Sequence, residues 1–138
     1  MSAVFPDGLI AIVKRDCPTC VLVVPVLNDL RERGGEELTV ISQDDPDFPE
    51  GLNAVDDTGL DISLDFNLDT VPTLLRWRDG KEVQRLVGWK RTEWEAFTGE
   101  SNLGPALPPH RPGCGSRTQD PDFVKARADK AGAESLRS

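Results

Sequence analysis

The chain has 138 residues, of which 38% are hydrophobic and 29% charged, and its formal net charge at pH 7 is -8. This length suits one domain with a hydrophobic core. The negative charge disfavours nucleic acids and anionic membranes as partners, and no apolar run approaches the roughly 18 residues of a membrane-spanning helix. The first residues lack the basic start of a signal peptide, so we expect a cytoplasmic protein. Its three cysteines should be kept reduced there, and their odd number argues against a disulfide framework.

The first part of the chain alternates strand and helix patterns. Residues 9–15 form an apolar run rich in β-branched side chains and predict a buried strand, and residues 38–43 predict a second strand. Between them, apolar residues at helical spacing, followed by Gly34 and Gly35, predict a helix of roughly 15 residues. Pro25 lies inside this helix and should kink it.

The middle of the chain is acidic and leads into a hairpin. Residues 44–70 contain nine acidic residues and no Lys or Arg. We predict a loop there, with a short helix near residues 49–57. The acidic residues lack the spacing of a calcium-binding EF-hand loop, so they are interpreted as a solvated charged face. Residues 73–78 and 82–89 then predict two strands joined by an Asp-Gly turn.

A last helix and a change in composition follow the hairpin. Residues 90–100 predict a helix with Thr92 as its N-cap and Glu95 three residues later, as in a capping box. The sequence then becomes rich in Pro and Gly. We therefore predict a folded domain at residues 1–100, followed at 101–138 by a linker and a weakly helical or disordered C-terminal tail. The predicted order of elements is β-α-β-α-β-β-α.

Cys17 and Cys20 are three positions apart, with Pro18 and Thr19 between them, at the start of the first predicted helix. The unpaired N–H groups and the dipole at a helix N-terminus favour a thiolate on the first sulfur. The second sulfur lies one turn further on, within reach of a disulfide. Such a dithiol attacks a substrate disulfide through Cys17 and releases the product through Cys20.

Cys114 and His110 leave alternatives open. Cys114 lies between two glycines in the predicted linker, which would make it accessible and flexible. We interpret it first as a free thiol on the tail, and second as an accessory redox thiol that reacts with Cys17. With His110 it could instead complete a zinc site whose other half is the cysteine pair, because zinc takes four ligands. A third possibility is that the pair consists of two inert thiols.

Four sequence features occur in a fixed order along the chain and are found together in one protein family. They are Cys17-Pro18-Thr19-Cys20, Pro25 within the following helix, Val71-Pro72-Thr73 before the hairpin, and Gly88 sixteen residues after Pro72. In this order they resemble the thioredoxin family, over roughly residues 3–99. In that family the proline of the Val/Ile-Pro-Thr motif is cis and faces the cysteines.

The resemblance implies an α/β fold, a three-layer α/β/α sandwich with a mixed central sheet. It implies a thiol-disulfide oxidoreductase that reduces or exchanges the disulfides of protein substrates, with electrons from a reductase or a small thiol. Neither an organic cofactor nor a metal is needed. Cys17 would be the nucleophile and Cys20 the resolving thiol. The residues implied in substrate binding are Pro18, Thr19, Val71, Pro72 and Thr73.

Two departures from the family pattern favour a different class of function. Asp16 replaces the tryptophan before the first cysteine, and its charge should disfavour a thiolate on Cys17. Ala11 replaces the buried acid that serves the family in proton transfer. Both departures favour a non-catalytic adapter or redox sensor that binds a partner protein. A glutathione-linked exchanger is a further alternative, weakened because no glutathione-carboxylate motif is evident.

Overall fold

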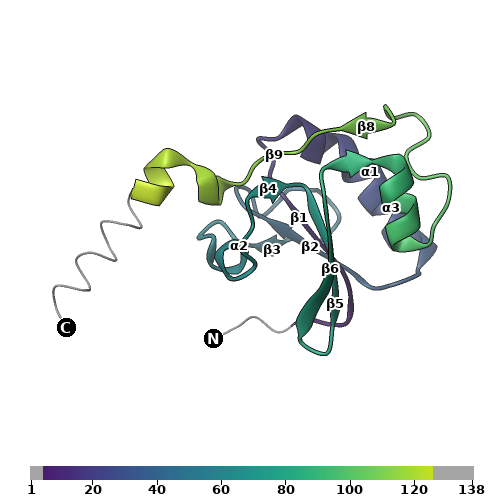
Figure 1. Ribbon diagram of the computed structural model, residues 1–138, viewed down its shortest axis with the longest axis horizontal. Coiled ribbons are helices and arrows are strands. Elements are labelled where there is room, and N and C mark those ends of the chain that lie inside the picture. Colours follow the sequence, from purple (N-terminus) through teal and green to yellow (C-terminus); the bar gives the residue numbers. More distant parts are fainter. Residues whose placement is uncertain (1–4, 126–138) are drawn as a thin grey trace.

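A five-stranded sheet lies at the centre of the molecule, with the strand order β3-β2-β1-β5-β6 (Figure 1). The computed structural model describes residues 5–125. β1, β2 and β3 are parallel, whereas β5 and β6 are antiparallel to their neighbours, which confirms the predicted mixed sheet. The β5–β6 hairpin turns at Asp79 and Gly80, whose φ angles of 53° and 77° suit a tight hairpin turn. The strands are β1 (Gly8–Val13), β2 (Leu38–Ser42), β3 (Val55–Asp56), β5 (Thr73–Arg78) and β6 (Lys81–Val87).

Helices cover both faces of the sheet. α1 (Pro18–Arg33) and α3 (Arg91–Thr98) lie on one side, and α2 (Asp61–Asp65) lies on the other (Figure 1). Two neighbouring residues of β5 contact the helices on opposite faces of the sheet. The guanidinium of Arg76 lies 4.7 Å from the ring centroid of Phe97 in α3, whereas the Trp77 ring lies 5.4 Å from that of Phe66 at the end of α2. The architecture is therefore the predicted three-layer α/β/α sandwich.

The core forms around β1 and the inner face of α1. All six residues of β1 are buried, because the strand has a neighbour on each side and is covered above and below. The buried residues of α1 recur at helical spacing: Thr19, Cys20, Val23, Val26, Leu27 and Leu30. Pro25 lies within α1 on its exposed side. In the part of the chain that the structure describes, no helix is both long enough and apolar enough to cross a membrane.

The short helix predicted near residues 49–57 is wrong, because the helix of this region is α2, further along the chain. The buried carboxylate of Asp57 instead accepts hydrogen bonds from the backbone N–H groups of Ile62 and Ser63, each at 2.9 Å. These are the free N–H groups of a helix start, so Asp57 fixes where α2 begins. This acidic residue is part of the core and not of a solvated face.

The predicted capping box of the last helix is also wrong. α3 begins at Arg91, and the extended residue before it is Lys90, which makes no side-chain cap. Lys90 takes this position because it ends the short strand β7 (Trp89–Lys90). The carboxylate of Glu95 accepts a hydrogen bond from the backbone N–H of Leu103 at 3.1 Å instead. Glu95 therefore joins α3 to the chain that follows it.

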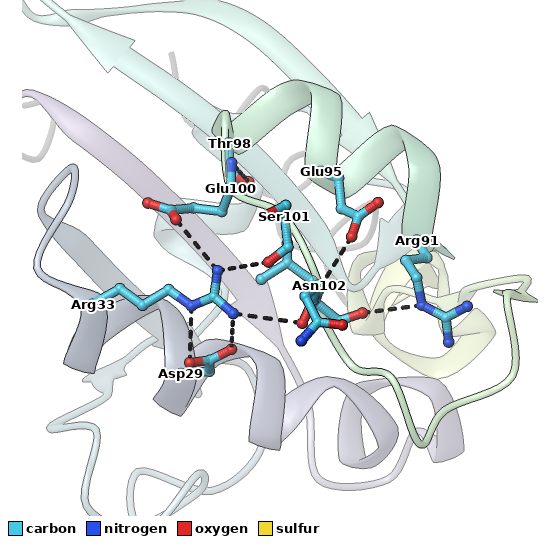
Figure 2. A network of polar contacts seen from close by, with 9 residues as sticks. Asp29, Arg33, Arg91, Glu95, Thr98, Glu100, Ser101 and Asn102 are labelled. Carbon is cyan, nitrogen blue, oxygen red and sulfur yellow. Dashed lines mark hydrogen bonds and ion pairs between the residues drawn. The ribbon is translucent and has the colours of Figure 1, made fainter.

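Two arginines hold the start of the C-terminal segment against α1 and α3 (Figure 2). Arg33, the last residue of α1, forms a salt bridge with Asp29 and donates to the carbonyl oxygen of Ser101 at 2.7 Å. Arg91, the first residue of α3, donates to the carbonyl oxygen of Leu103 at 3.0 Å. Leu103 is completely buried in the core. The chain after residue 100 thus continues the domain.

The segment that follows lies along the domain, which differs from the predicted linker. β8 (His110–Arg111) pairs with β7, and β9 (Cys114–Gly115) pairs with β4 (Thr70–Val71), so that β9 lies beside β4 (Figure 1). A 3₁₀ helix, Arg117–Gln119, comes next. We call residues 107–119 the strap. Residues 121–125 are helical, and the rest of the predicted tail, residues 126–138, lies outside the described residues.

Candidate functional site

Cys17 is the N-cap residue of α1. Its backbone is extended, with φ -157° and ψ 109°, and its sulfur accepts a hydrogen bond from the backbone N–H of Cys20 at 3.3 Å. Pro18 occupies the first helical position, where a missing N–H costs nothing. The helix then places Cys20 one turn below Cys17, where it is completely buried. The motif therefore forms the start of a helix, as the sequence predicts, with Cys17 as its outer and Cys20 as its inner thiol. The expectation that the first sulfur is exposed is wrong, because Cys17 is buried as well.

The loop before β5 faces the outer thiol. The Val71–Pro72 peptide bond is cis, and the Cys17 sulfur lies 3.7 Å from the carbonyl oxygen of Val71. The carbonyl oxygen of Pro72 accepts a hydrogen bond from the N–H of Gly88 at 2.9 Å. Thr73 is buried at the start of β5. The fold thus brings together the two sequence motifs, which lie about fifty residues apart in the chain.

The two thiols of the motif have opposite acidities. The pKa of Cys17 is lowered to about 6, mainly because the Cys20 thiol hydrogen-bonds to its sulfur. Burial acts against this shift, while hydrogen bonds from the Cys114 thiol and from the N–H groups of Cys20 and Thr19 add to it. The pKa of Cys20 is raised, first by burial and then by its hydrogen bond to Cys17. Asp16 is exposed, so solvent screens its charge, and its expected opposition to the thiolate does not prevail.

The strap crosses over this pair of thiols. Thr19 donates a hydrogen bond from its hydroxyl to the carbonyl oxygen of Pro112 at 2.7 Å, and Cys114 is the antiparallel partner of Val71. The thiol of Cys114 contributes to the lowered pKa of Cys17. Under the strap, Cys17 is only 1% exposed. The predicted accessible, flexible Cys114 is therefore a half-buried residue of a strand, whose pKa burial raises.

Comparison with known proteins gives a family match over most of the domain. The TraF family model, described as F plasmid transfer operon protein, matches residues 6–88, which is more than half of the chain. The chain belongs to the thioredoxin family. It is similar to the thioredoxin of Listeria monocytogenes, with 30% identity over 77 residues, which are 56% of this chain and 64% of that protein.

Thioredoxins of two mycobacteria are similar at the same level. That of Mycolicibacterium smegmatis is 33% identical over 75 residues, or 54% of this chain and 58% of that protein. That of Mycobacterium tuberculosis is 31% identical over 74 residues, or 54% of each chain. The match thus spans less than two thirds of the length of these thioredoxins.

A buried polar cluster fastens the end of the strap to this thioredoxin-family domain. The completely buried amide of Gln43 donates to the hydroxyls of Ser63 at 2.9 Å and of Ser116 at 2.7 Å. Its oxygen accepts from the backbone N–H of Arg117 at 3.0 Å, and the hydroxyl of Thr118 donates to the carbonyl oxygen of Leu68 at 2.6 Å. We call this cluster the latch. Buried polar groups paired in this way cost little, whereas unpaired ones cost much more, so the latch favours a docked strap.

Sequence reasoning missed the strap and the latch. Pro112, Gly113 and Ser116 lie in a stretch whose Pro and Gly content is typical of a linker, and Gln43 carries no motif. The sequence does contain one signal of ordered structure here. Ser116 and Thr118 lie two positions apart, and Ser and Thr hydroxyls can cap a turn. In the structure Ser116 caps the 3₁₀ helix. His110, the other candidate zinc ligand, lies exposed in β8. Among residues 5–125, no group of three or more His, Cys, Asp or Glu side chains is arranged to hold a metal ion.

The lowered pKa of Cys17 predicts how its alkylation depends on pH. The thiolate is the reactive form, so the rate should follow its population, which rises as pH increases through about 6. We expect an increase of about tenfold between pH 5 and pH 8, with little change above pH 7.5. The measurement is iodoacetamide labelling, with the modified cysteine located by mass spectrometry. A rate that rises nearly tenfold per pH unit up to about pH 8 and levels off only above pH 9 would instead indicate an ordinary thiol.

Proposed function

We propose that this protein is a thiol-disulfide oxidoreductase that reduces or exchanges protein disulfides through Cys17 and Cys20. The chain belongs to a family of such oxidoreductases. The observation that carries the proposal is the difference between the two thiols. The pKa of Cys17 is lowered to about 6, so it is mostly thiolate at neutral pH, while the raised pKa of Cys20 keeps this thiol protonated in reserve.

The reaction then follows in two exchanges. The Cys17 thiolate attacks one sulfur of the substrate disulfide, and the other substrate sulfur leaves as a thiolate and takes up a proton. Cys20 next loses its proton and attacks the Cys17 sulfur, which releases the second substrate thiol. Two electrons have passed to the substrate, and a Cys17–Cys20 disulfide remains. A reductase or a small thiol restores the dithiol.

The loop beside the thiols offers a place for the substrate. An extended segment can pair with the backbone of Val71, which lies against Cys17 and already accepts a strand in this structure. Pro72 and Thr73 belong to this loop and to the start of β5, while Pro18 and Thr19 begin the helix whose N-cap is Cys17. Thiol-disulfide exchange needs no organic cofactor. A cytoplasmic location remains our proposal, resting on the expectation of reduced thiols.

A redox titration tests whether the two cysteines act as a pair. The protein is equilibrated in mixtures of reduced and oxidised dithiothreitol, and its free thiols are alkylated and mapped by mass spectrometry. We expect Cys17 and Cys20 to change together as a two-electron couple, with a single midpoint. Separate midpoints, or a pair that never forms, would contradict the proposal.

A redox sensor or adapter is the second candidate, and the buried nucleophile favours it. With the strap docked, Cys17 is almost inaccessible to a substrate. In a sensor, the thiols would oxidise reversibly and release or bind a partner protein without turnover. Insulin reduction by dithiothreitol separates the two functions, because an oxidoreductase accelerates the reaction whereas a sensor leaves it at the uncatalysed rate.

A further inference from the structure

The strap pairs with the backbone edge of β4, beside Cys17, as an added strand. Cys114 pairs with Val71 and Gly115 with Thr70 in antiparallel register. The N–H of Ser116 donates to the carbonyl oxygen of Asp69 at 3.0 Å, which extends the pairing by one step. Adding a strand beside an exposed backbone edge is a common way to bind an extended peptide. Here the peptide belongs to the same chain.

The close approach of the strap to β4 depends on Gly113. A Cβ atom on Gly113 would lie 2.6 Å from Cγ2 of Thr70 and 2.7 Å from the carbonyl oxygen of Val71. No side chain fits at these distances, so the strap reaches its position because residue 113 has none. Gly115, two positions on, would meet no atom within 4 Å. The two glycines therefore form a matched pair for experiment.

The position of the strap places a third sulfur at the reactive one. Cys114 lies opposite Val71, whose carbonyl oxygen lies 3.7 Å from the Cys17 sulfur. The Cys114 thiol helps to lower the pKa of Cys17, as the Cys20 thiol does. Cys17 thus has two thiol neighbours, one from its own helix and one from the strap.

We propose that Cys114 is a third redox thiol of this centre, which the strap presents to Cys17 as an internal substrate. The inference rests on the proposed function, because it uses the same nucleophile. Starting from the Cys17–Cys20 disulfide, the Cys114 thiolate attacks the Cys17 sulfur. The Cys17–Cys114 bond forms, the Cys17–Cys20 bond breaks, and Cys20 leaves as a thiolate that takes up the proton lost by Cys114. No electrons are gained or lost, so the two disulfides interconvert without an added oxidant.

The Cys20→Ser variant tests this step, because it removes the competing thiol. The variant is treated with oxidised glutathione, which accepts the two electrons and becomes two molecules of glutathione, and it is then digested with trypsin. We expect a disulfide between the peptides that carry Cys17 and Cys114, residues 16–31 and 92–117. Its yield should not depend on protein concentration, because the link forms within one chain. The Cys17→Ser variant, which keeps Cys20 and Cys114, should give no such link.

Two further variants separate a docked strap from chance encounters. Adding Gly113→Ala to Cys20→Ser should slow the formation of the link at least about tenfold, because the added Cβ forces the strap away from Val71. Adding Gly115→Ala should leave the rate within about twofold, since that Cβ meets open space. Circular dichroism checks that both variants are folded. Equal rates in the two would overturn the proposal.

The remaining outcomes distinguish this proposal from the proposed function. If wild-type protein forms the Cys17–Cys20 disulfide but Cys20→Ser gives no link to Cys114, or only links between chains, the third-thiol proposal is overturned and the dithiol function stands. If the Cys114→Ser variant fails to form the Cys17–Cys20 disulfide, the proposed function fails. In that case the Cys17–Cys114 disulfide in Cys20→Ser still tests whether Cys114 reacts with Cys17.

Discussion

Insulin reduction by dithiothreitol should fall to its uncatalysed rate when Cys17 is replaced by serine. The hydroxyl of serine is a far weaker acid than the thiol whose pKa is lowered to about 6, so the variant has no anionic nucleophile at neutral pH. Cys20 does not replace it, because this thiol is completely buried and its pKa is raised. The measurement is the rate of insulin precipitation at several concentrations of the protein.

The control for this variant is the substitution of an exposed residue that is not a thiol. Val83 is 46% exposed on β6, which is not paired with β4, so Val83→Ala should keep wild-type turnover. Urea unfolding of Cys17→Ser should show that the loss of turnover does not come from loss of fold. Turnover that persists in Cys17→Ser would remove the assigned nucleophile.

The Trp94→Ala variant should have the largest effect on stability, with a free energy of unfolding lower by about 3–5 kcal/mol. Trp94 is 1% exposed, and its ring centroid lies 5.2 Å from that of Trp89. Its indole N–H donates to the carbonyl oxygen of Gly88 at 2.9 Å, and the N–H of Gly88 in turn donates to the carbonyl oxygen of Pro72. The substitution therefore opens a cavity and also loosens the loop that faces Cys17.

Urea unfolding at equilibrium measures this change. Val83→Ala again serves as a control, and we expect its free energy of unfolding to stay within about 0.5 kcal/mol of wild type. Trp94→Phe should give an intermediate loss, because it keeps most of the apolar contact but removes the indole N–H. A midpoint for Trp94→Ala equal to that of Val83→Ala would contradict the assigned place of Trp94 in the core.

The fold could be predicted from local patterns because its main elements carry them. The apolar run of β1, the helical spacing in α1 and the Asp-Gly turn of the hairpin are each local signals, and the structure has all three elements. α2 was misplaced because its start depends on Asp57, which binds N–H groups five and six residues further on. A side chain that caps from such a distance has no simple sequence pattern.

The candidate site could be predicted only in part. Cys17 and Cys20 are recognisable because a helix start gives two cysteines at this spacing different environments. The strap has no such signal. Its Pro and Gly residues indicate a linker, although Gly113 in fact permits a close contact with Thr70 and Val71. The bond between Gln43 and Ser116 joins residues 73 positions apart, and only the folded chain brings them together.

Because the strap is fixed at both ends, any other disulfide must compete with it for the edge of β4 beside Cys17. This competition sets a minimum affinity for a substrate. A segment tethered beside its own site acts at an effective concentration of about 1 mM or more. To compete equally with the strap, a partner protein present at about 1 µM must therefore bind this edge roughly a thousandfold more tightly than the strap would as a free peptide. Small disulfides contact little of this edge, so they would compete with the strap only at concentrations of about 1 mM or more. Among disulfide proteins at low concentration, competition with the strap would thus favour the few that bind this edge well.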